Sequence, residues 1–211
     1  MIRLFIGNED GTNLSLFKEV PVPIFPNMET TPIPVIILPT FEVNLEGTFK
    51  LESEKALFAT TQNNEQFNII AEGESWSYSN PDHACCSHLR ETASNGINTI
   101  NEANTSLDGS GAIVPVIKAN VTNGNIINRI TIKALQSTHP GMVRLFINDG
   151  HDNYLYKEVI IPESTQASNI PSYKHVIEGN FYMQKDFSLG ASTQLSESFA
   201  LTIESVMFSY A

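Results

Sequence analysis

The sequence contains 211 residues with a formal net charge of -11, because 23 acidic residues outnumber 12 lysines and arginines. That excess of acid disfavours nucleic acid as a partner, since phosphate backbones are bound by clustered Lys and Arg. Hydrophobic residues at 41% and charged residues at 17% exclude intrinsic disorder, and the apolar run 33–38 is too short to span a membrane.

The first 23 residues predict a β-hairpin. Its loop, 7–13, turns at Asp10-Gly11, a residue pair that suits the backbone angles of a tight turn. Pro23 ends the return strand, because proline has no amide hydrogen to donate to a sheet. A Pro-rich connector, 21–39, comes next, and further strands are expected at 41–51, 56–62 and 66–78.

Residues 81–88 are expected to link an N-terminal domain, 1–80, to a C-terminal domain, 89–211. The linker contains side chains of the types that bind metals, His83, Cys85, Cys86 and His88. Zinc sites usually draw pairs of ligands from two separate segments, so we favour a plain linker and expect no metal. Neighbouring cysteines seldom form a disulfide with each other, so we expect a fold that depends on packing, made in a reducing compartment.

The lead-in 89–141 and the segments after it predict a complete β-sandwich. Strand-like runs at 112–121 and 126–134 are joined by Asn123-Gly124, a strong hairpin signal. A second hairpin is expected over 142–161, and final strands at 174–185, 187–194 and 198–210. About eight strands of this kind indicate an antiparallel, jelly-roll-like sandwich. The fold class is all-β, because β-branched and aromatic residues alternate with turn formers.

An internal repeat relates the two halves of the chain. Two blocks recur in the same order, 1–23 at 142–162 and 57–78 at 189–210. The equivalent residues include Arg3 and Arg144, Lys18 and Lys157, Phe5 and Phe146, and Phe67 and Phe199. Because both blocks keep their order, we expect two related β modules, with these four phenylalanines buried.

The two copies are unequal, because copy two has the lead-in 89–141 whereas copy one begins at Met1 directly on its first strand. An N-terminal module that is incomplete in this way leaves a sheet edge open or a core half covered. Three explanations stay open: a neighbouring chain supplies the strands, copy one is a smaller self-sufficient sheet, or the natural start lies elsewhere. We favour the neighbour, and the expected assembly interface comprises Met1, Ile2, Leu4, Ile6, Pro32, Ile33, Pro34, Ile36 and Trp76.

The repeated charged residues are expected to pair across strands rather than to act in catalysis. Lys18 and Glu19 are adjacent, so on a strand they face opposite sides and cannot converge on one substrate atom. The predicted cross-strand pairs are Arg3 with Glu19 and Arg144 with Glu158. The other repeated glutamates are expected to face solvent: Glu65, Glu72, Glu197 and Glu204.

The sequence predicts a non-enzymatic protein without a cofactor. The nucleophile motif G-x-S-x-G, the zinc motif H-E-x-x-H and the Gly-rich phosphate-binding motifs are absent. The loops 8–10 and 148–153 carry oxygen ligands without the spacing of a calcium loop, so we interpret them as turns. Trp76 is replaced by Phe208 in copy two, which favours a core or interface position over one that stacks on a sugar.

Three motifs of copy two carry a resemblance to a known group of proteins. They are N-x-x-L-D-G-[ST]-G at 104–111, I-x-R-I-x-I-K-A at 127–134 and G-M-[IV]-R-L-F-I-x-D-G at 141–150. Together with the segment 189–194, they resemble small β-sandwich proteins encoded among the structural genes of tailed bacteriophages. The resemblance covers most of 89–211 and, through the repeat, much of 1–78.

The resemblance implies a virion component, such as a capsid decoration or auxiliary (cement) protein, assembled in the host cytoplasm. The expected partners are the major capsid protein or other virion proteins, with further copies of the chain in a homo-oligomer. The alternative is a carbohydrate-binding or receptor-binding β-sandwich module of a phage tail or cell surface. Such a module needs an exposed aromatic platform or a calcium loop.

Overall fold

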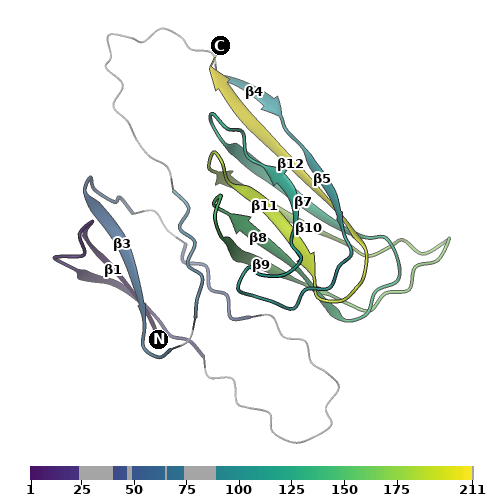
Figure 1. The fold of residues 1–211 in the computed structure, drawn as a ribbon, viewed down its shortest axis with the longest axis horizontal. Helices are drawn as coiled ribbons and strands as arrows, with labels where there is room; N and C mark the ends of the chain where they lie inside the picture. The colour runs from purple at the N-terminus through teal and green to yellow at the C-terminus, as the bar shows by residue number, and fades with distance from the viewer. Residues whose placement is uncertain (24–39, 47–48, 65, 74–88, 211) are drawn as a thin grey trace, which may run out of the picture. The chain divides into compact units, whose positions relative to one another are not determined.

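The computed structural model describes residues 1–23, 40–46, 49–64, 66–73 and 89–210. The chain divides into two compact units, Met1–Ile69 and Ile70–Ala211 (Figure 1). The described residues form twelve strands in antiparallel sheets and contain no helix, which confirms the all-β prediction. In this part of the chain no helix has the length and apolar character needed to cross a membrane. The predicted linker, 81–88, lies outside the described residues.

The N-terminal unit contains one three-stranded sheet. Its strands are β1 (Ile2–Asn8), β2 (Ser15–Val20) and β3 (Lys55–Thr61), in the order β2-β1-β3. The predicted hairpin is present, and its turn places Gly11 at a φ of 78°, a conformation that glycine adopts without strain. The core of this unit consists of Ile2, Leu4 and Val20, with Val22, Phe41, Leu57 and Phe67 packed against it.

The C-terminal unit contains nine strands. They are β4 (Leu89–Ala93), β5 (Gly96–Ile100), β6 (Val114–Lys118), β7 (Asn125–Ala134), β8 (Gly141–Asn148), β9 (Asn153–Ile161), β10 (Lys174–Met183), β11 (Ser188–Thr193) and β12 (Phe199–Tyr210). One sheet has the order β10-β7-β12-β4, with β5 also paired to β12, and the other has the order β6-β11-β8-β9. A single core cluster draws side chains from both sheets, including Ile132 of β7, Leu145 of β8 and Leu201 of β12. The unit is therefore the β-sandwich that the sequence predicts.

The hairpin expected at Asn123-Gly124 is wrong, because β6 and β7 belong to different sheets. β6 pairs with β11, whereas β7 pairs with β10 on one side and β12 on the other. The turn itself is present: Gly124 has a φ of 70°, and the Asn120 side chain accepts hydrogen bonds from the amides of Thr122 and Asn123. Turn residues determine where the chain reverses direction, but they do not determine which strands the two flanking segments pair with. Here the turn connects a strand of one sheet to a strand of the other.

The strands expected at 41–51 and 66–78 are also wrong for the residues that the structure describes. Residues 41–46, 49–51 and 66–73 form no strand, and 74–78 lie outside the described residues. In the C-terminal unit the equivalent segments are β10 and β12, and both obtain their backbone partners from β7. The described part of the N-terminal unit has no counterpart of β7, so alternating apolar residues alone do not produce a strand there.

The repeat extends to strand register. The order β2-β1-β3 of the N-terminal unit matches β9-β8-β11 of the C-terminal one. Arg3 lies opposite Glu19 and Arg144 opposite Glu158, and in both hairpins the register shifts between the first and second residues after the arginine. The described part of the N-terminal unit thus reproduces three strands of one sheet of the sandwich and contains no second sheet.

Candidate assembly surface

The residues expected at an assembly interface fall into three groups. Ile2 and Leu4 are buried in the core of the N-terminal unit, while Met1 and Ile6 are partly exposed. The other expected positions lie outside the described residues: Pro32, Ile33, Pro34, Ile36 and Trp76. Among the described positions, Met1 and Ile6 are therefore the ones with surface left for a partner.

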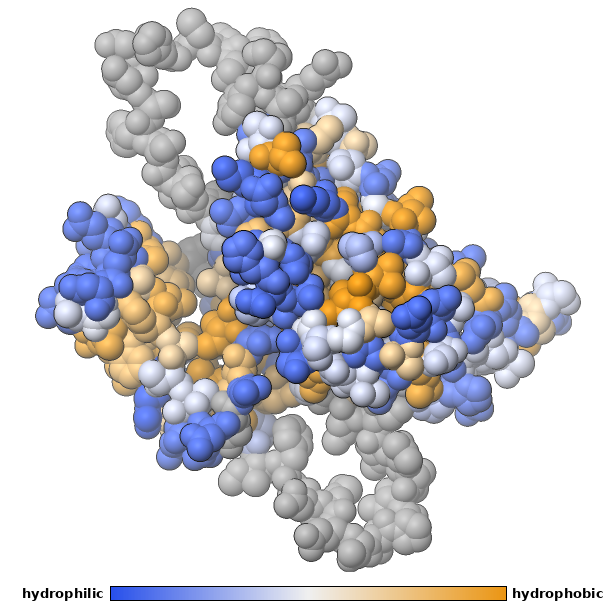
Figure 2. Space-filling model, viewed as in Figure 1, coloured by the Kyte–Doolittle hydropathy of each residue, from blue (hydrophilic) through white to orange (hydrophobic). Residues whose placement is uncertain are grey.

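The N-terminal unit exposes many large apolar side chains besides these. They occur on β2 and its loop and on the segments either side of β3, and comprise Leu14, Leu16, Phe17, Val43, Leu45, Phe49, Leu51 and Ile69. Figure 2 shows part of this surface, as orange side chains on the N-terminal unit at the left of the view. Two of these side chains, Phe17 and Phe49, are in ring contact, and exposed apolar side chains that gather on a soluble protein mark a site of interaction. We call this set the uncovered face.

Three residues of the uncovered face, Phe49, Leu51 and Ile69, have buried equivalents in the C-terminal unit. The exposed fraction is 49% for Phe49 and 8% for its equivalent Phe181. It is 45% for Ile69 and 0% for its equivalent Leu201. The two units therefore carry the same kinds of side chain at these positions, but among the described residues a second sheet covers only those of the C-terminal unit.

A pair of aromatic rings occurs in both units. The ring centroids of Tyr156 and Phe181 are 5.1 Å apart, and those of the equivalent Phe17 and Phe49 are 4.7 Å apart. The interplanar angles are also similar, at 41° and 44°. Segment 49–51 thus keeps the contact that β10 makes with β9, although it is not part of a strand.

Both predicted cross-strand ion pairs are confirmed, but they differ in environment. Arg144 Nε lies 2.8 Å from Glu158 Oε1, and the two side chains are only 6% and 4% exposed. Arg3 and Glu19 have the same separation with exposed fractions of 39% and 45%. In the C-terminal unit the turn 104–111 covers the pair, and Arg144 Nη1 donates a hydrogen bond to the Asn104 carbonyl oxygen.

Arg129 of β7 joins two strands on the outer side of its sheet. Its Nε lies 2.9 Å from Glu178 Oε1 on β10, and its Nη1 lies 3.1 Å from Glu204 Oε2 on β12. Arg129 is directly opposite both glutamates in the register. Hydrogen bonding and charge from Glu178, with the charge of Glu204, raise the pKa of the Arg129 guanidinium. The guanidinium thus acts as a cationic bridge over the centre of the sheet.

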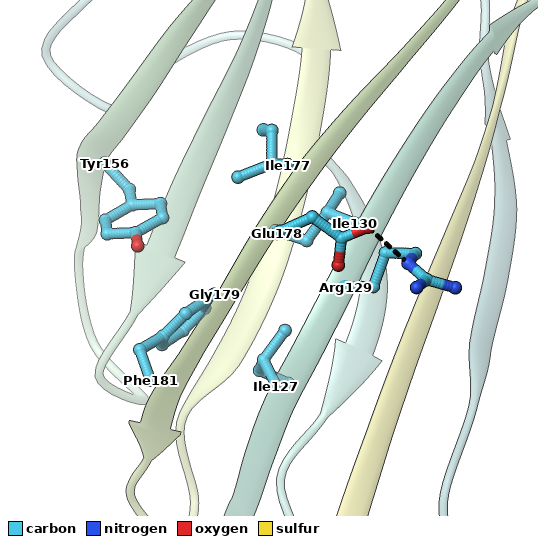
Figure 3. A pocket seen from close by; sticks show the side chains of 8 residues that line it. All are labelled: Ile127, Arg129, Ile130, Tyr156, Ile177, Glu178, Gly179 and Phe181. Atoms are coloured by element: carbon cyan, nitrogen blue, oxygen red, sulfur yellow. Dashed lines mark hydrogen bonds and ion pairs between the residues drawn. The ribbon is translucent and has the colours of Figure 1, made fainter.

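A small cavity lies beside this bridge, and Figure 3 shows its lining. Tyr156 and Phe181 form one side, and Arg129 is joined to Glu178 by the dashed ion pair. The other lining residues are Ile127, Ile130, Ile177 and Gly179. Its volume is about 30 Å³, whereas small-molecule sites typically enclose about 300–1,000 Å³. The cavity is a packing gap with room for water rather than for a substrate.

Two acidic residues, Asp149 and Glu197, support loops by accepting hydrogen bonds. Asp149 Oδ1 accepts hydrogen bonds from the amides of His151 and Asp152, which supports the interpretation of this loop as a turn. Glu197 is buried, so its expected solvent-facing position is wrong: its Oε1 accepts hydrogen bonds from the His139 amide and from Nδ1 of the same residue.

No group of three or more possible metal ligands occurs in the described ranges, and His83 to His88 lie outside them.

The sequence analysis missed the cationic bridge of Arg129. The signal was present, because Leu45-Glu46-Gly47-Thr48-Phe49 corresponds to Ile177-Glu178-Gly179-Asn180-Phe181. This similarity extends the repeat across β10 and identifies Glu46 as the equivalent of Glu178. The repeat had already matched Glu72 to Glu204. The Glu204 side chain is exposed, as predicted, but it forms an ion pair with Arg129 of β7.

Comparison with known proteins gives no family assignment. No protein-family model matches the chain, and no curated protein sequence matches it. Among solved structures, the chain is similar to one in the cyanophage Pam1 capsid asymmetric unit, at 15% identity and a TM-score of 0.31. The alignment covers 69% of this chain and 97% of the other.

Proposed function

We propose that this chain is a structural protein of a virion, specifically a decoration or auxiliary protein on the capsid of a tailed bacteriophage. It does no chemistry in this role and instead binds the major capsid protein, other virion proteins or further copies of itself. The finer description of its sandwich as jelly-roll-like is part of the same proposal. Assembly takes place in the host cytoplasm.

The observation that carries the proposal is the uncovered face of the N-terminal unit. Phe49, Leu51 and Ile69 are each more than two-fifths exposed, while the equivalent residues of the C-terminal unit are buried. Burial of apolar surface contributes about 25 cal/mol per Å², so this face favours a partner that covers it. The motif resemblance at 104–111, 127–134 and 141–150 supports placing that partner in a phage particle.

The alternative of glycan binding depends on exposed rings, and Phe17 and Phe49 are such rings. Their contact reproduces that of Tyr156 and Phe181, which belongs to the packing of the sandwich. We therefore attribute the exposure of Phe17 and Phe49 to the incomplete unit rather than to a sugar platform. A glycan array separates the two functions, because the assembly role predicts no glycan-dependent signal.

The direct test is mass spectrometry of purified phage particles that carry the gene for this chain. We expect the chain in the particles in a fixed ratio to the major capsid protein, and density for its two units on the capsid surface. Presence only in lysate, with none in washed particles, would contradict the proposal. Presence at the tail tip alone would support the receptor-binding alternative.

A further inference from the structure

β3 lies at an edge of its sheet, whereas its equivalent β11 lies between two strands. The order β2-β1-β3 leaves one side of β3 without a neighbouring strand among the described residues. In the C-terminal unit β11 is paired with β8 on one side and with β6 on the other. The free side of β3 therefore corresponds to the side of β11 that β6 occupies.

The outward backbone groups of β3 belong to its odd-numbered residues. The Gln62 amide, directly after the strand, donates to the Met1 carbonyl oxygen at 3.0 Å. Because the backbone groups of successive strand residues point to opposite sides, the even-numbered residues of β3 face β1. The backbone groups of Leu57, Ala59 and Thr61 consequently point to the free side, where no described residue forms a hydrogen bond with them.

The equivalent backbone groups of β11 do have partners. The carbonyl oxygen of Thr193, the equivalent of Thr61, accepts a hydrogen bond from the Asn104 amide at 2.8 Å. Leu189, the equivalent of Leu57, is paired with β6. The same backbone positions are thus bonded in the C-terminal unit and available to a partner in the N-terminal one.

β3 lacks the features that usually protect an exposed strand edge, which are proline, charged side chains, bulges and covering groups. Its register with β1 continues without a shift from end to end, and its one charged residue is Lys55 at the start. By contrast, β6 contains Pro115, whose carbonyl oxygen accepts a hydrogen bond from Asn98 Nδ2. On β9 the Tyr173 hydroxyl donates to the Ile160 carbonyl oxygen, and β2 is interrupted by a register shift.

We propose that two copies of this chain pair through β3, edge to edge and antiparallel, so that their three-stranded sheets become one continuous sheet. In the two-fold register that pairs the whole strand, Phe58 lies opposite the partner's Phe58. Leu57 then lies opposite the partner's Ala59, and Lys55 lies opposite the partner's Thr61. The inference goes beyond the proposed function and does not rest on it, because the isolated chain should pair in solution.

A second copy fits this edge because β3 is complementary to itself. In the stated register the outward backbone groups of Leu57 meet those of the partner's Ala59, and no like charges lie opposite each other. The two half-buried Phe58 side chains meet at the two-fold axis, at a closely spaced position where cross-strand rings are in contact. Both copies therefore gain backbone hydrogen bonds, and neither loses an existing strand pair.

The first test is amide exchange of the full chain at two concentrations. Between about 10 μM and about 1 mM we expect the mass measured by light scattering to double. The amides of Leu57, Ala59 and Thr61 should then exchange at least about tenfold more slowly. Those of Phe58 and Thr60, which are bonded to β1, should be protected equally at both concentrations. A chain that stays monomeric, or a dimer that leaves the three outward amides unprotected, would overturn the inference.

Two variants of Thr61 test the register. Thr61→Glu places a carboxylate opposite the partner's Lys55 and Thr61→Lys places a cation there, so at low salt Thr61→Glu should dimerise about tenfold more tightly. The net charge of -11 opposes this order, because Thr61→Lys lowers the general repulsion between copies. Equal or tighter dimerisation of Thr61→Lys would overturn the register. The matched control is Ser15→Glu against Ser15→Lys, on the other edge strand β2, where only the effect of net charge is expected.

Cross-linking at the two-fold axis provides a second readout. In a Cys85→Ser, Cys86→Ser background, Phe58→Cys brings two thiols to facing, closely spaced positions within reach of a disulfide. The matched control Ala56→Cys lies opposite the partner's Thr60, so its two thiols are kept apart. Under the same mild oxidation we expect Phe58→Cys to form covalent dimer at least about tenfold faster than the control. Equal rates would contradict the proposal.

The particle experiment and the solution experiments fail independently. A chain that dimerises through β3 but is absent from particles would overturn the proposed function and leave this inference intact. A chain that is monomeric in solution and gains protection at Leu57, Ala59 and Thr61 only in particles would overturn the second copy as partner. It would assign the edge to a strand of a different virion protein.

Discussion

The hairpins β1-β2 and β8-β9 are nearly the same structure in two different environments. Each has an arginine 2.8 Å from a glutamate on the facing strand, and each has a bulge at the equivalent position. Yet Arg144 is 6% exposed and Arg3 is 39% exposed. Register and bulge therefore follow from the hairpin's own residues, whereas burial follows from what the rest of the chain places over it.

The source of the difference is the lead-in to the C-terminal unit. It supplies the turn 104–111 over the arginine, β6 beside β11, and β7 for the second sheet. Gly109 in that turn has a φ of 83°, and a Cβ there would collide with the Asn153 backbone, so the turn lies directly against the start of β9. The same hairpin thus has a large core in one unit and a small one in the other.

The largest expected contrast concerns the two equivalent phenylalanines. Phe146 is fully buried, so Phe146→Ala should lower the free energy of unfolding of the C-terminal unit by about 3–5 kcal/mol. Phe5 is only half-buried, so Phe5→Ala should cost the N-terminal unit about 1 kcal/mol. Urea unfolding and amide exchange at β8 and β1 measure the two losses. Equal losses would show that the N-terminal core is as well packed as the other.

The ion pairs give the next contrast. Arg144→Met removes the guanidinium from the buried Glu158 carboxylate and from the Asn104 carbonyl oxygen, and should cost about 3 kcal/mol. Arg3→Met acts on an exposed pair and should cost less than about 1 kcal/mol. Raising the salt concentration should reduce the Arg3 effect further and leave the Arg144 effect nearly unchanged. Salt sensitivity at both positions would contradict the assigned burial.

Sequence reasoning succeeded where local residues decide the outcome. The hairpins β1-β2 and β8-β9, the turns at Gly11 and Gly124, and the partners of Arg3 and Arg144 all follow from neighbours in sequence or directly opposite positions. Sequence reasoning failed where the structure of a segment depends on pairing with a strand far away in sequence. The segment 41–51 has the pattern of a strand, but a strand needs a backbone partner, and β7 provides one only to the C-terminal copy.

The assembly interface stays a prediction, and two of the residues chosen for it were misplaced for the same reason. The residues chosen included Ile2 and Leu4, which the small sheet buries by itself. Exposure instead falls on Phe49 and Ile69, whose partners would come from a second sheet. Glu197 was misassigned because its role depends on the His139 amide, far away in sequence.

The ring pairs give a smaller effect that tests whether segment 49–51 keeps its packing. In a double-mutant cycle, Tyr156→Ala and Phe181→Ala should show a coupling energy of about 1 kcal/mol. Phe17→Ala and Phe49→Ala should show about 0.5 kcal/mol, because their ring contact is the same but is open to water. A zero coupling for Phe17 and Phe49 would mean that the second contact contributes nothing in solution.

The smallest expected effect is the pH dependence of the two hairpin loops. Hydrogen bonds from the Thr12 hydroxyl and then the Thr12 amide lower the pKa of Asp10, and amides of Asp152 and His151 lower the pKa of Asp149. The pKa of each carboxyl is lower in the folded state than its ordinary value of 3.8. Each carboxylate therefore stabilises its loop fully at a pH above that ordinary pKa, and this stabilisation is lost as the pH falls through the lowered pKa of the folded state.

The variant Thr12→Val distinguishes the two loops, because it removes the hydroxyl and keeps the amide. We expect the pKa of Asp10 to rise part of the way toward its ordinary value, while the pKa of Asp149, which depends first on amides, does not move. Carboxyl chemical shifts followed by NMR from pH 6 down to about pH 2 measure both titrations. If Asp10 titrates identically in the parent chain and in Thr12→Val, the hydroxyl at 2.6 Å is not what holds the carboxylate in its charged form.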